Sequence, residues 1–309
     1  MDSAPHPNPA NQPDTEPRAP TPSISIRSEA LRILCLADPA DKCAQVHALV
    51  VAAKAGSLPW DTDSPLHPDP QWPLPGRPNL PELIDPALVP TRSPFTTEGR
   101  AALLHAICHI EFNAINLALD AVWRFAGMPE AFYRDWLRVA AEEAEHFSLL
   151  HNHLRTLHSS QNQPYQYGDF AAHDGLWAMC EKTAGDITAR MALVPRTLEA
   201  RGLDATPLIQ AKLRKVGAPN SKGVSGAPDA LVMCDLLDII LRDEVGHVAI
   251  GNHWYAWLCA RQKLDPIAHY KVLARHHAAP RLKPPFNQEA RRQAGFSDEE
   301  LAFLLTGGV

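Results

Sequence analysis

Apolar residues recur with a helical period over most of the chain after residue 95. The first long helix is expected over roughly 96–126, ending at Gly127, with an apolar stripe of Leu104, Ile107, Cys108, Ile115, Leu119 and Val122. A second is expected from Pro129, a favoured first helical position, to about His158. Its apolar face carries Trp136, Val139, Phe147, Leu150 and Leu154.

Two further helices follow a polar connection. One is expected from about Asp174 to about Arg201, followed by a shorter piece over 207–216. The other runs from Asp229 to about Gln262 and carries Leu237, Leu241, Val248, Tyr255 and Leu258. Four long helices with a long connection between the second and third predict an all-α fold, with a ferritin-like four-helix bundle over 96–262.

The rest of the chain lacks a long helical pattern. Residues 1–25 predict a disordered, proline-rich tail, and 26–58 predict short additional N-terminal helices broken at "ADPAD". Residues 59–95 contain eleven prolines and predict an extended linker that wraps the surface or joins these helices to the bundle. Residues 263–309 form a basic, proline-interrupted C-terminal extension with no predicted place in the fold.

Composition narrows the class of protein. The formal net charge of −6 gives no general attraction to nucleic acid or anionic membrane, and no uninterrupted apolar run is long enough to span a bilayer. The N-terminus lacks the basic-then-apolar pattern of a signal peptide. The six cysteines form no Cys-x-x-Cys pair, so we expect reduced thiols in a cytoplasmic protein and no cysteine-based metal site.

Two Glu-x-x-His pairs lie where the pattern predicts core. They are Glu143 with His146, and Glu244 with His247, each near the middle of a long helix and on its apolar face. With 15 Glu and 15 His in 309 residues, about one such match is expected by chance, so their positions matter more than the strings. A buried ionisable pair is costly unless it is hydrogen-bonded or holds a metal.

Distances along the helices predict two partners for these pairs. Glu143 lies fifteen residues after the turn at Met128, and Glu111 lies seventeen before it, so both reach one level of the helical hairpin. Glu244 and Glu199 are similarly placed about the turn at 217–228. The four helices therefore deliver six residues to one layer: Glu111, Glu143, His146, Glu199, Glu244 and His247.

One Glu from each of two helices, with Glu-x-x-His from each of the other two, is the ligand set of a carboxylate-bridged dinuclear site. Oxygen and imidazole ligands suit iron or manganese, and two iron ions are the predicted cofactor. Glu181 and Asp186 compete with Glu199, although Asp186 also suits an ion pair with Arg190, and Glu142 competes with Glu143.

Small residues and a proline accompany the predicted ligands. Pro195 lies one turn before Glu199 and should kink that helix. Two explanations fit the small residues near the predicted ligands: space beside the metals, or close packing of helices. These residues are Gly185, Thr188 and Ala192 on the same helix, and Gly251 one turn beyond His247. His105 and His109 lie on a different face of their helix from Glu111, which favours a structural or surface role.

Several strings resemble a known family: "HAICHIEFNAINLALDAVWRF", "AAEEAEHFSLL", "DGLWAMCEKTAGDITARMALVPRTLEARGLDATP" and "ILRDEVGHVAIGN". They are similar to a ferritin-like family of uncharacterised bacterial proteins, domain of unknown function 455, over roughly residues 26–262. The resemblance implies a ferritin-like bundle with a di-metal centre, distantly similar to di-iron tRNA hydroxylases. It also marks "APNSKGVSG" as an insertion between the last two helices. Without part of this insertion, the sequence separation of Glu199 and Glu244 approaches the one usual in di-iron bundles, which supports Glu199 as the ligand.

The leading hypothesis is an oxygen-dependent di-iron oxidoreductase, of the hydroxylase or oxygenase type. Its expected partners are a small-molecule or tRNA substrate and a separate electron-donor protein, because nothing in the sequence binds flavin or nicotinamide. We expect no association with a membrane, and we expect the chain to form a homodimer. The alternatives are an iron-binding or ferroxidase-type protein without an organic substrate, and a metal-free structural bundle.

Overall fold

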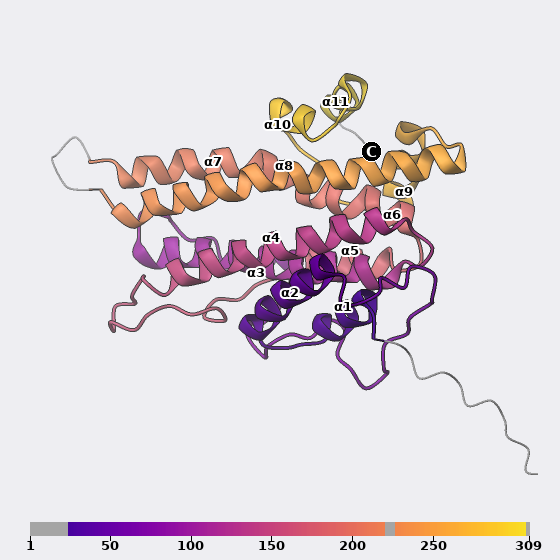
Figure 1. The fold of residues 1–309 in the computed structure, drawn as a ribbon. Coiled ribbons are helices and arrows are strands. Elements are labelled where there is room, and N and C mark those ends of the chain that lie inside the picture. The colour runs from indigo at the N-terminus through magenta and orange to yellow at the C-terminus, as the bar shows by residue number, and fades with distance from the viewer. Residues whose placement is uncertain (1–23, 220–225, 307–309) are drawn as a thin grey trace, which may run out of the picture.

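The structure is a computed structural model that describes residues 24–219 and 226–306, and it is all-helical over those residues (Figure 1). Isolated bridges join Leu83 to Ala172 and His158 to Pro164, but the described residues contain no strand. The all-α prediction is therefore confirmed. The predicted disordered tail lies outside the described residues except for Ile24 and Ser25.

Three long helices match the predicted ones closely. They are α3 (Thr97–Arg124), α4 (Glu130–Leu154) and α8 (Pro228–Gln262). The Thr96 hydroxyl accepts a hydrogen bond from the Gly99 amide and caps α3, and Gly127, with φ 77°, allows the sharp turn into α4. Pro129 is the N-cap of α4 and not its first residue, and α4 ends before the predicted His158.

The third predicted helix is wrong in detail. The chain forms α5 (Gly175–Lys182), α6 (Ile187–Leu193), a π-helix η2 (Val194–Glu199) and α7 (Ala200–Gly217). The break after α5 arises because the Asp186 carboxylate caps α6, accepting from the amides of Thr188 and Ala189 at 2.8 and 3.0 Å. The predicted restart at residues 206–207 is also wrong, since Pro207 lies inside α7.

Pro195 accounts for the π-helix. It has no amide hydrogen, so a regular α-helical bond is lost there, and the Thr197 hydroxyl donates to the Ala192 carbonyl at 2.8 Å instead. Helix α8 approaches this segment closely at Gly251, where an added Cβ would lie 2.5 Å from the Pro195 Cβ. Close packing, rather than space beside a metal, therefore explains Gly251.

The N-terminal part packs on one side of these helices, as Figure 1 shows. Helices α1 (Ile26–Leu34) and α2 (Pro39–Ala55) are separated at the predicted position, where the Asp38 carboxylate caps α2. Residues 59–95 then wrap the surface with the short 3-10 helix η1 (Pro86–Leu88). The amide of Gly76 bonds the Leu34 carbonyl at 2.9 Å, which ties this wrap to α1.

Helix α3 is buried on two faces. Opposite its apolar stripe lies a polar stripe with buried side chains: His105, His109, Asn113, Asn116 and Asp120. Their partners come mostly from segments outside the long helices. The Gly168 amide donates to His105 Nε2 at 2.9 Å, and the buried Lys42 of α2 donates to Asn116. The sequence correctly favoured a structural role for His105 and His109.

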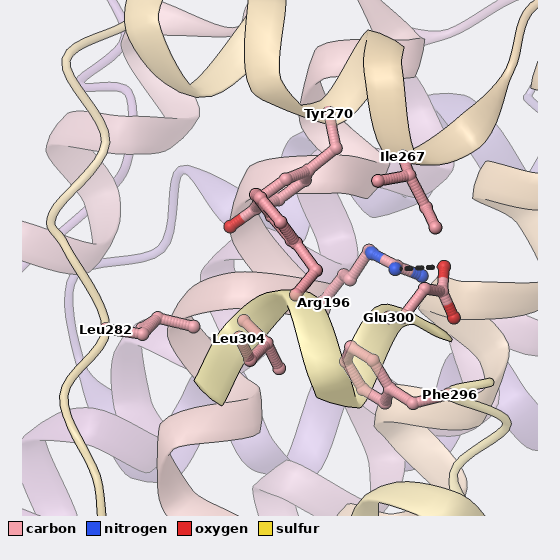
Figure 2. A pocket seen from close by; sticks show the side chains of 8 residues that line it. Arg196, Ile267, Tyr270, Leu282, Phe296, Glu300 and Leu304 are labelled. Atoms are coloured by element: carbon pink, nitrogen blue, oxygen red, sulfur yellow. Dashed lines mark hydrogen bonds and ion pairs between the residues drawn. The ribbon is translucent and has the colours of Figure 1, made fainter. Parts of the chain in front are cut away.

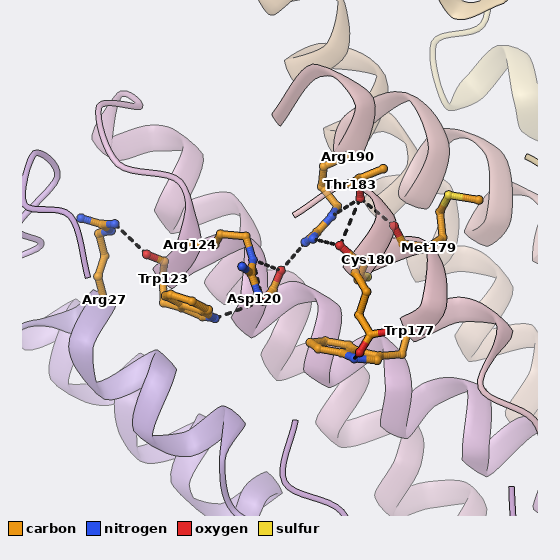
Figure 3. Close-up of polar contacts among 10 residues, drawn as sticks. Arg27, Asp120, Trp123, Arg124, Trp177, Met179, Cys180, Thr183 and Arg190 are labelled. Carbon is orange, nitrogen blue, oxygen red and sulfur yellow. Dashed lines mark hydrogen bonds and ion pairs between the residues drawn. The ribbon is translucent and has the colours of Figure 1, made fainter. Parts of the chain in front are cut away.

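Asp120 is the most heavily bonded member of this polar stripe (Figure 3). Its carboxylate accepts from Trp123 Nε1 at 3.1 Å, from Arg124 at 2.7 Å and from the buried Arg190. Arg190 thus joins α6 to α3, and the predicted pairing of Arg190 with Asp186 is wrong. Arg27 of α1 donates to the Trp123 carbonyl at 2.6 Å and caps the end of α3.

The C-terminal extension covers the opposite side of the molecule. It contains α9 (Pro266–His276), α10 (Gln288–Gln293) and α11 (Asp298–Leu305). Arg196 of η2 holds it in place by an ion pair with Glu300, with its guanidinium 4.7 Å from the Phe296 ring centroid (Figure 2). Arg196 also donates a 2.8 Å bond to Asn252 of α8. A shallow hollow beside this pair is lined mostly by apolar side chains of α9 and α11.

The structure bears on two expectations from composition, the absence of a membrane-spanning run and the reduced state of the cysteines. Helix α3 is long and apolar enough to cross a membrane, but 78% of its apolar window is buried inside the protein, as is usual for a core helix. All six cysteines are free thiols, and all but Cys35 are buried.

Replacing Gly251 by Ala should destabilise the protein by about 1–3 kcal/mol, because the added methyl group collides with the rigid Pro195 ring. Chemical denaturation followed by circular dichroism would measure the loss. Gly246→Ala is the control, since Gly246 is in the same helix with nothing within 4 Å of an added Cβ. Equal stability of the two variants would contradict the close-packing explanation.

The contribution of His105 to the stability of the protein should decrease as the pH falls from about 6.5 to about 4. Burial, followed by the nearby His109 and His151, lowers the pKa of His105 from 6.5 to about 4. The unfolded chain therefore takes up this proton first, and the loss from His105 approaches about 3 kcal/mol below pH 4.

The comparison is between wild type and His105→Gln, which keeps an acceptor for the Gly168 amide but does not titrate. As the pH falls over this range, the unfolding free energy of the variant should rise relative to that of wild type, because the variant has no His105 contribution to lose. Parallel pH profiles would show that His105 does not contribute.

Candidate metal centre

The two Glu-x-x-His pairs face each other across the contact between α4 and α8. Glu143 and His146 lie on α4, Glu244 and His247 on α8, and all four side chains are buried. The two imidazole rings are 5.8 Å apart between centroids. The helical spacing that places each pair on one face therefore also brings the two pairs together.

Glu143 lies between the two histidines. Its Oε2 is 3.3 Å from His146 Nδ1, and its Oε1 is 2.9 Å from His247 Nδ1. Glu244 Oε1 lies 3.6 Å from the same His247 nitrogen. A carboxylate with one oxygen toward each imidazole has the arrangement expected of a ligand shared by two cations.

Glu111 reaches this cluster from α3. Its Oε2 lies 3.6 Å from His146 Nδ1. One donor atom from each of Glu111, Glu143, His146 and Glu244 lies within 4.8 Å of the other three, so these four residues form a group that can hold a metal ion.

Glu199, the last residue of η2, comes close to the cluster without bonding to it. Its side chain is buried, and neither carboxylate oxygen has a hydrogen-bond partner among the described residues. Burial, then the charges of Glu244 and Glu143, raises the pKa of Glu199, which places it within electrostatic reach of both. The structure thus brings five of the six predicted residues into direct contact and leaves Glu199 beside them.

The outer nitrogen of each histidine bonds a carboxylate from the opposite helix. His146 Nε2 lies 3.1 Å from Asp243 of α8, and His247 Nε2 lies 2.7 Å from Glu142 of α4. Such partners fix the ring orientation and the tautomer of a metal-binding histidine, leaving Nδ1 free toward the cluster. Glu142, considered as an alternative to Glu143, occupies this outer position.

Asp243 was missed by the sequence analysis. A signal was present, since an acidic residue directly precedes the glutamate of both pairs, as Glu142-Glu143 and Asp243-Glu244. Adjacent residues on a helix point about 100° apart, so the preceding acid cannot join the same cluster but can reach the histidine of the facing helix.

The unpaired atoms of the cluster test whether a metal fits. Among the described residues, eleven buried side-chain polar atoms lack a hydrogen bond, and six of them belong to this cluster, on Glu111, Glu143, Glu199, Glu244 and His247. The 2.9 Å approach of Glu143 Oε1 to His247 Nδ1 also lacks hydrogen-bond geometry. Unsatisfied buried groups are rare in native proteins, so their concentration here favours a bound ion.

The charges in the cluster agree with that conclusion. Burial and the Glu143 charge raise the pKa of Glu111. Burial opposes protonation of His146, yet the neighbouring carboxylates of Glu111 and Glu143 raise its pKa to about 11. Without metal, protons therefore supply the positive charge that the carboxylates attract. Four glutamates would offset the charge of two divalent cations.

The competing residues on the third helical segment lie elsewhere. Glu181 is exposed and accepts a 3.0 Å bond from Trp177, and Asp186 caps α6. Neither belongs to the metal-binding group. Oxygen and nitrogen donors without sulfur disfavour soft, thiolate-seeking metals at this site.

Comparisons with known proteins agree on the family. Residues 35–302 match a family described as "Protein of unknown function (DUF455)". An "Uncharacterized protein" of Haemophilus influenzae (strain ATCC 51907 / DSM 11121 / KW20 / Rd) is 50% identical over 234 residues, which cover 74% of this chain and 75% of that protein. No solved structure matches the chain.

Divalent metal should stabilise the metal-free protein. At a concentration of Mn²⁺ or Fe²⁺ one hundred times the dissociation constant, each bound ion adds about 2.7 kcal/mol, which a thermal melt would detect as a rise of several degrees. Glu143→Gln should abolish the rise because Glu143 faces both histidines. Glu181→Gln is the control, and an equal rise in both variants would contradict the site.

Proposed function

Since this chain belongs to the DUF455 family, whose description assigns no function, we propose from the site itself that it is an oxygen-dependent di-iron oxidoreductase of the hydroxylase type. In this proposal α3, α4, α8 and the segmented run from α5 to α7 form a ferritin-like four-helix bundle. The centre holds two iron ions, with manganese as the alternative metal. The observation that carries the proposal is the convergence of unpaired carboxylate and imidazole atoms from these four elements.

Each protein group has a defined part in this proposal. Glu143 and Glu244 would hold the ions together with Glu111 on the His146 side and Glu199 on the His247 side, and the two histidines would bind through Nδ1. Glu142 and Asp243 hold the imidazoles in place. When bound, two irons would supply the capacity to bind and reduce dioxygen.

The surroundings favour controlled chemistry over simple iron deposition. The cluster residues are nearly or fully buried, and α1 and α2 cover α3 and α4 while α10 packs on α7 and α8. Covering a reactive centre excludes water and prevents side reactions. We therefore rank a hydroxylase above a ferroxidase-type protein.

The proposed partners follow from the same reasoning. A reductase must supply electrons, and we propose a separate electron-donor protein and a small organic substrate, in a cytoplasmic protein that forms a homodimer. A tRNA substrate has weaker support, because the basic C-terminal stretch is partly used inside the fold: Arg291 is buried against Asp204, and Arg292 pairs with Asp298.

The test is oxygen consumption by protein loaded anaerobically with two Fe²⁺ per chain. Wild type should consume oxygen and do so again after each reduction, with its iron retained, whereas Glu143→Gln should lose at least nine-tenths of the rate. Iron that accumulates well beyond two ions per chain would support the ferroxidase alternative instead. A loaded protein that does not react with oxygen would refute the proposal.

A further inference from the structure

We propose that the two metal positions are unequal and fill in sequence, with Glu199 as the late ligand. The position beside His146 is formed in advance, whereas the position beside His247 is completed when Glu199 moves toward it. This inference rests on the proposed dinuclear centre and deepens it.

The position beside His146 is already assembled. Glu143 and Glu111 lie 3.3 and 3.6 Å from His146 Nδ1, and Glu244 belongs to the same group of donors within 4.8 Å of one another. All four residues lie on regular α-helices. Because α3 is packed on both faces, Glu111 in particular is fixed before any ion arrives.

The outer support of His146 is equally firm. Asp243 lies 3.1 Å from His146 Nε2 and also accepts two bonds from Arg242, at 2.8 and 3.0 Å. A carboxylate held from two sides restricts the imidazole it orients. The first ion therefore meets a site whose ligands need little rearrangement, which is the condition for tight binding.

The position beside His247 is incomplete. Glu143 and Glu244 approach His247 Nδ1 to 2.9 and 3.6 Å, but Glu199 is not in the group of four donors, and both its oxygens lack a hydrogen bond within the described chain. The outer partner Glu142 is 38% exposed, against 21% for Asp243. Two features thus distinguish the two sides: the contact of the fourth ligand and the exposure of the outer carboxylate.

The backbone at Glu199 is suited to this movement. Glu199 ends a π-helix that lies against Gly251 on one side and carries Arg196, bonded to Asn252 and Glu300, on another. Residues around Glu199 are anchored, and Glu199 itself has ordinary helical dihedral angles, φ −69° and ψ −40°, so the proposed movement is a rotation of its side chain. A shift of the Glu199 side chain therefore needs no reorganisation of α3, α4 or α8.

The experiment is a titration of metal-free protein with Mn²⁺, followed by calorimetry and by the electron paramagnetic resonance signal of free Mn²⁺. Wild type should bind two ions in steps that differ at least tenfold in dissociation constant. Glu199→Gln should keep one ion with the affinity of the first wild-type step. Glu111→Gln should lose that tight step.

Glu145→Gln is the matched control, because Glu145 is exposed on α4 between the ligands and should leave both steps unchanged. Circular dichroism checks that each variant folds, and Glu111→Asp replaces Glu111→Gln if the latter does not, with a weakened first step expected. Two wild-type ions of indistinguishable affinity, or loss of the tight step in Glu199→Gln, would overturn the sequential order. Folded wild type that binds no Mn²⁺ or Fe²⁺ would instead refute the dinuclear centre.

Discussion

The burial of four carboxylates and two imidazoles between helices is the constraint on which the rest of this structure depends. Charges of one sign cannot be withdrawn from water together unless protons or cations neutralise them. The facing arrangement of Glu143 and His247, with a short approach but no hydrogen-bond geometry, suits a shared cation better than a proton. A fold that retains such a cluster in its middle gives up stability in the metal-free state.

Much of the remaining architecture holds the cluster in place. Gly251 allows α8 to contact the π-helix that ends at Glu199, and Arg196 in the same π-helix fastens the C-terminal extension through Glu300. On the other side, the polar stripe of α3 anchors α2 and the α4–α5 connection, and Arg27 of α1 bonds the end of α3. The N- and C-terminal additions thus stabilise the two elements that each contribute a single glutamate.

The sequence predicted the parts of this arrangement that depend on helical periodicity. The helices α3, α4 and α8, and the approach of Glu111, Glu143 and Glu244 to one another, follow from a 3.6-residue repeat and from equal distances to a turn. It failed where local bonds compete with the repeat. Asp186 caps a new helix, and Pro195 makes a π-turn. The short C-terminal helices have local caps, but α9 and α10 pack on α6, α7 and α8 through contacts that no local pattern encodes.

The same distinction bears on the chemistry of the site. Where a ligand lies on a regular helix, the helical repeat both allows its prediction and fixes its position. Glu111 on α3 is such a ligand. Glu199 was the least certain of the predicted ligands because Glu181 and Asp186 on the same segment competed with it, and its carboxylate has no hydrogen bond among the described residues. A buried carboxylate without a hydrogen bond is costly, so it is retained where it serves as a ligand. Glu199 is therefore both the ligand that the sequence predicted least firmly and the ligand that we propose to move.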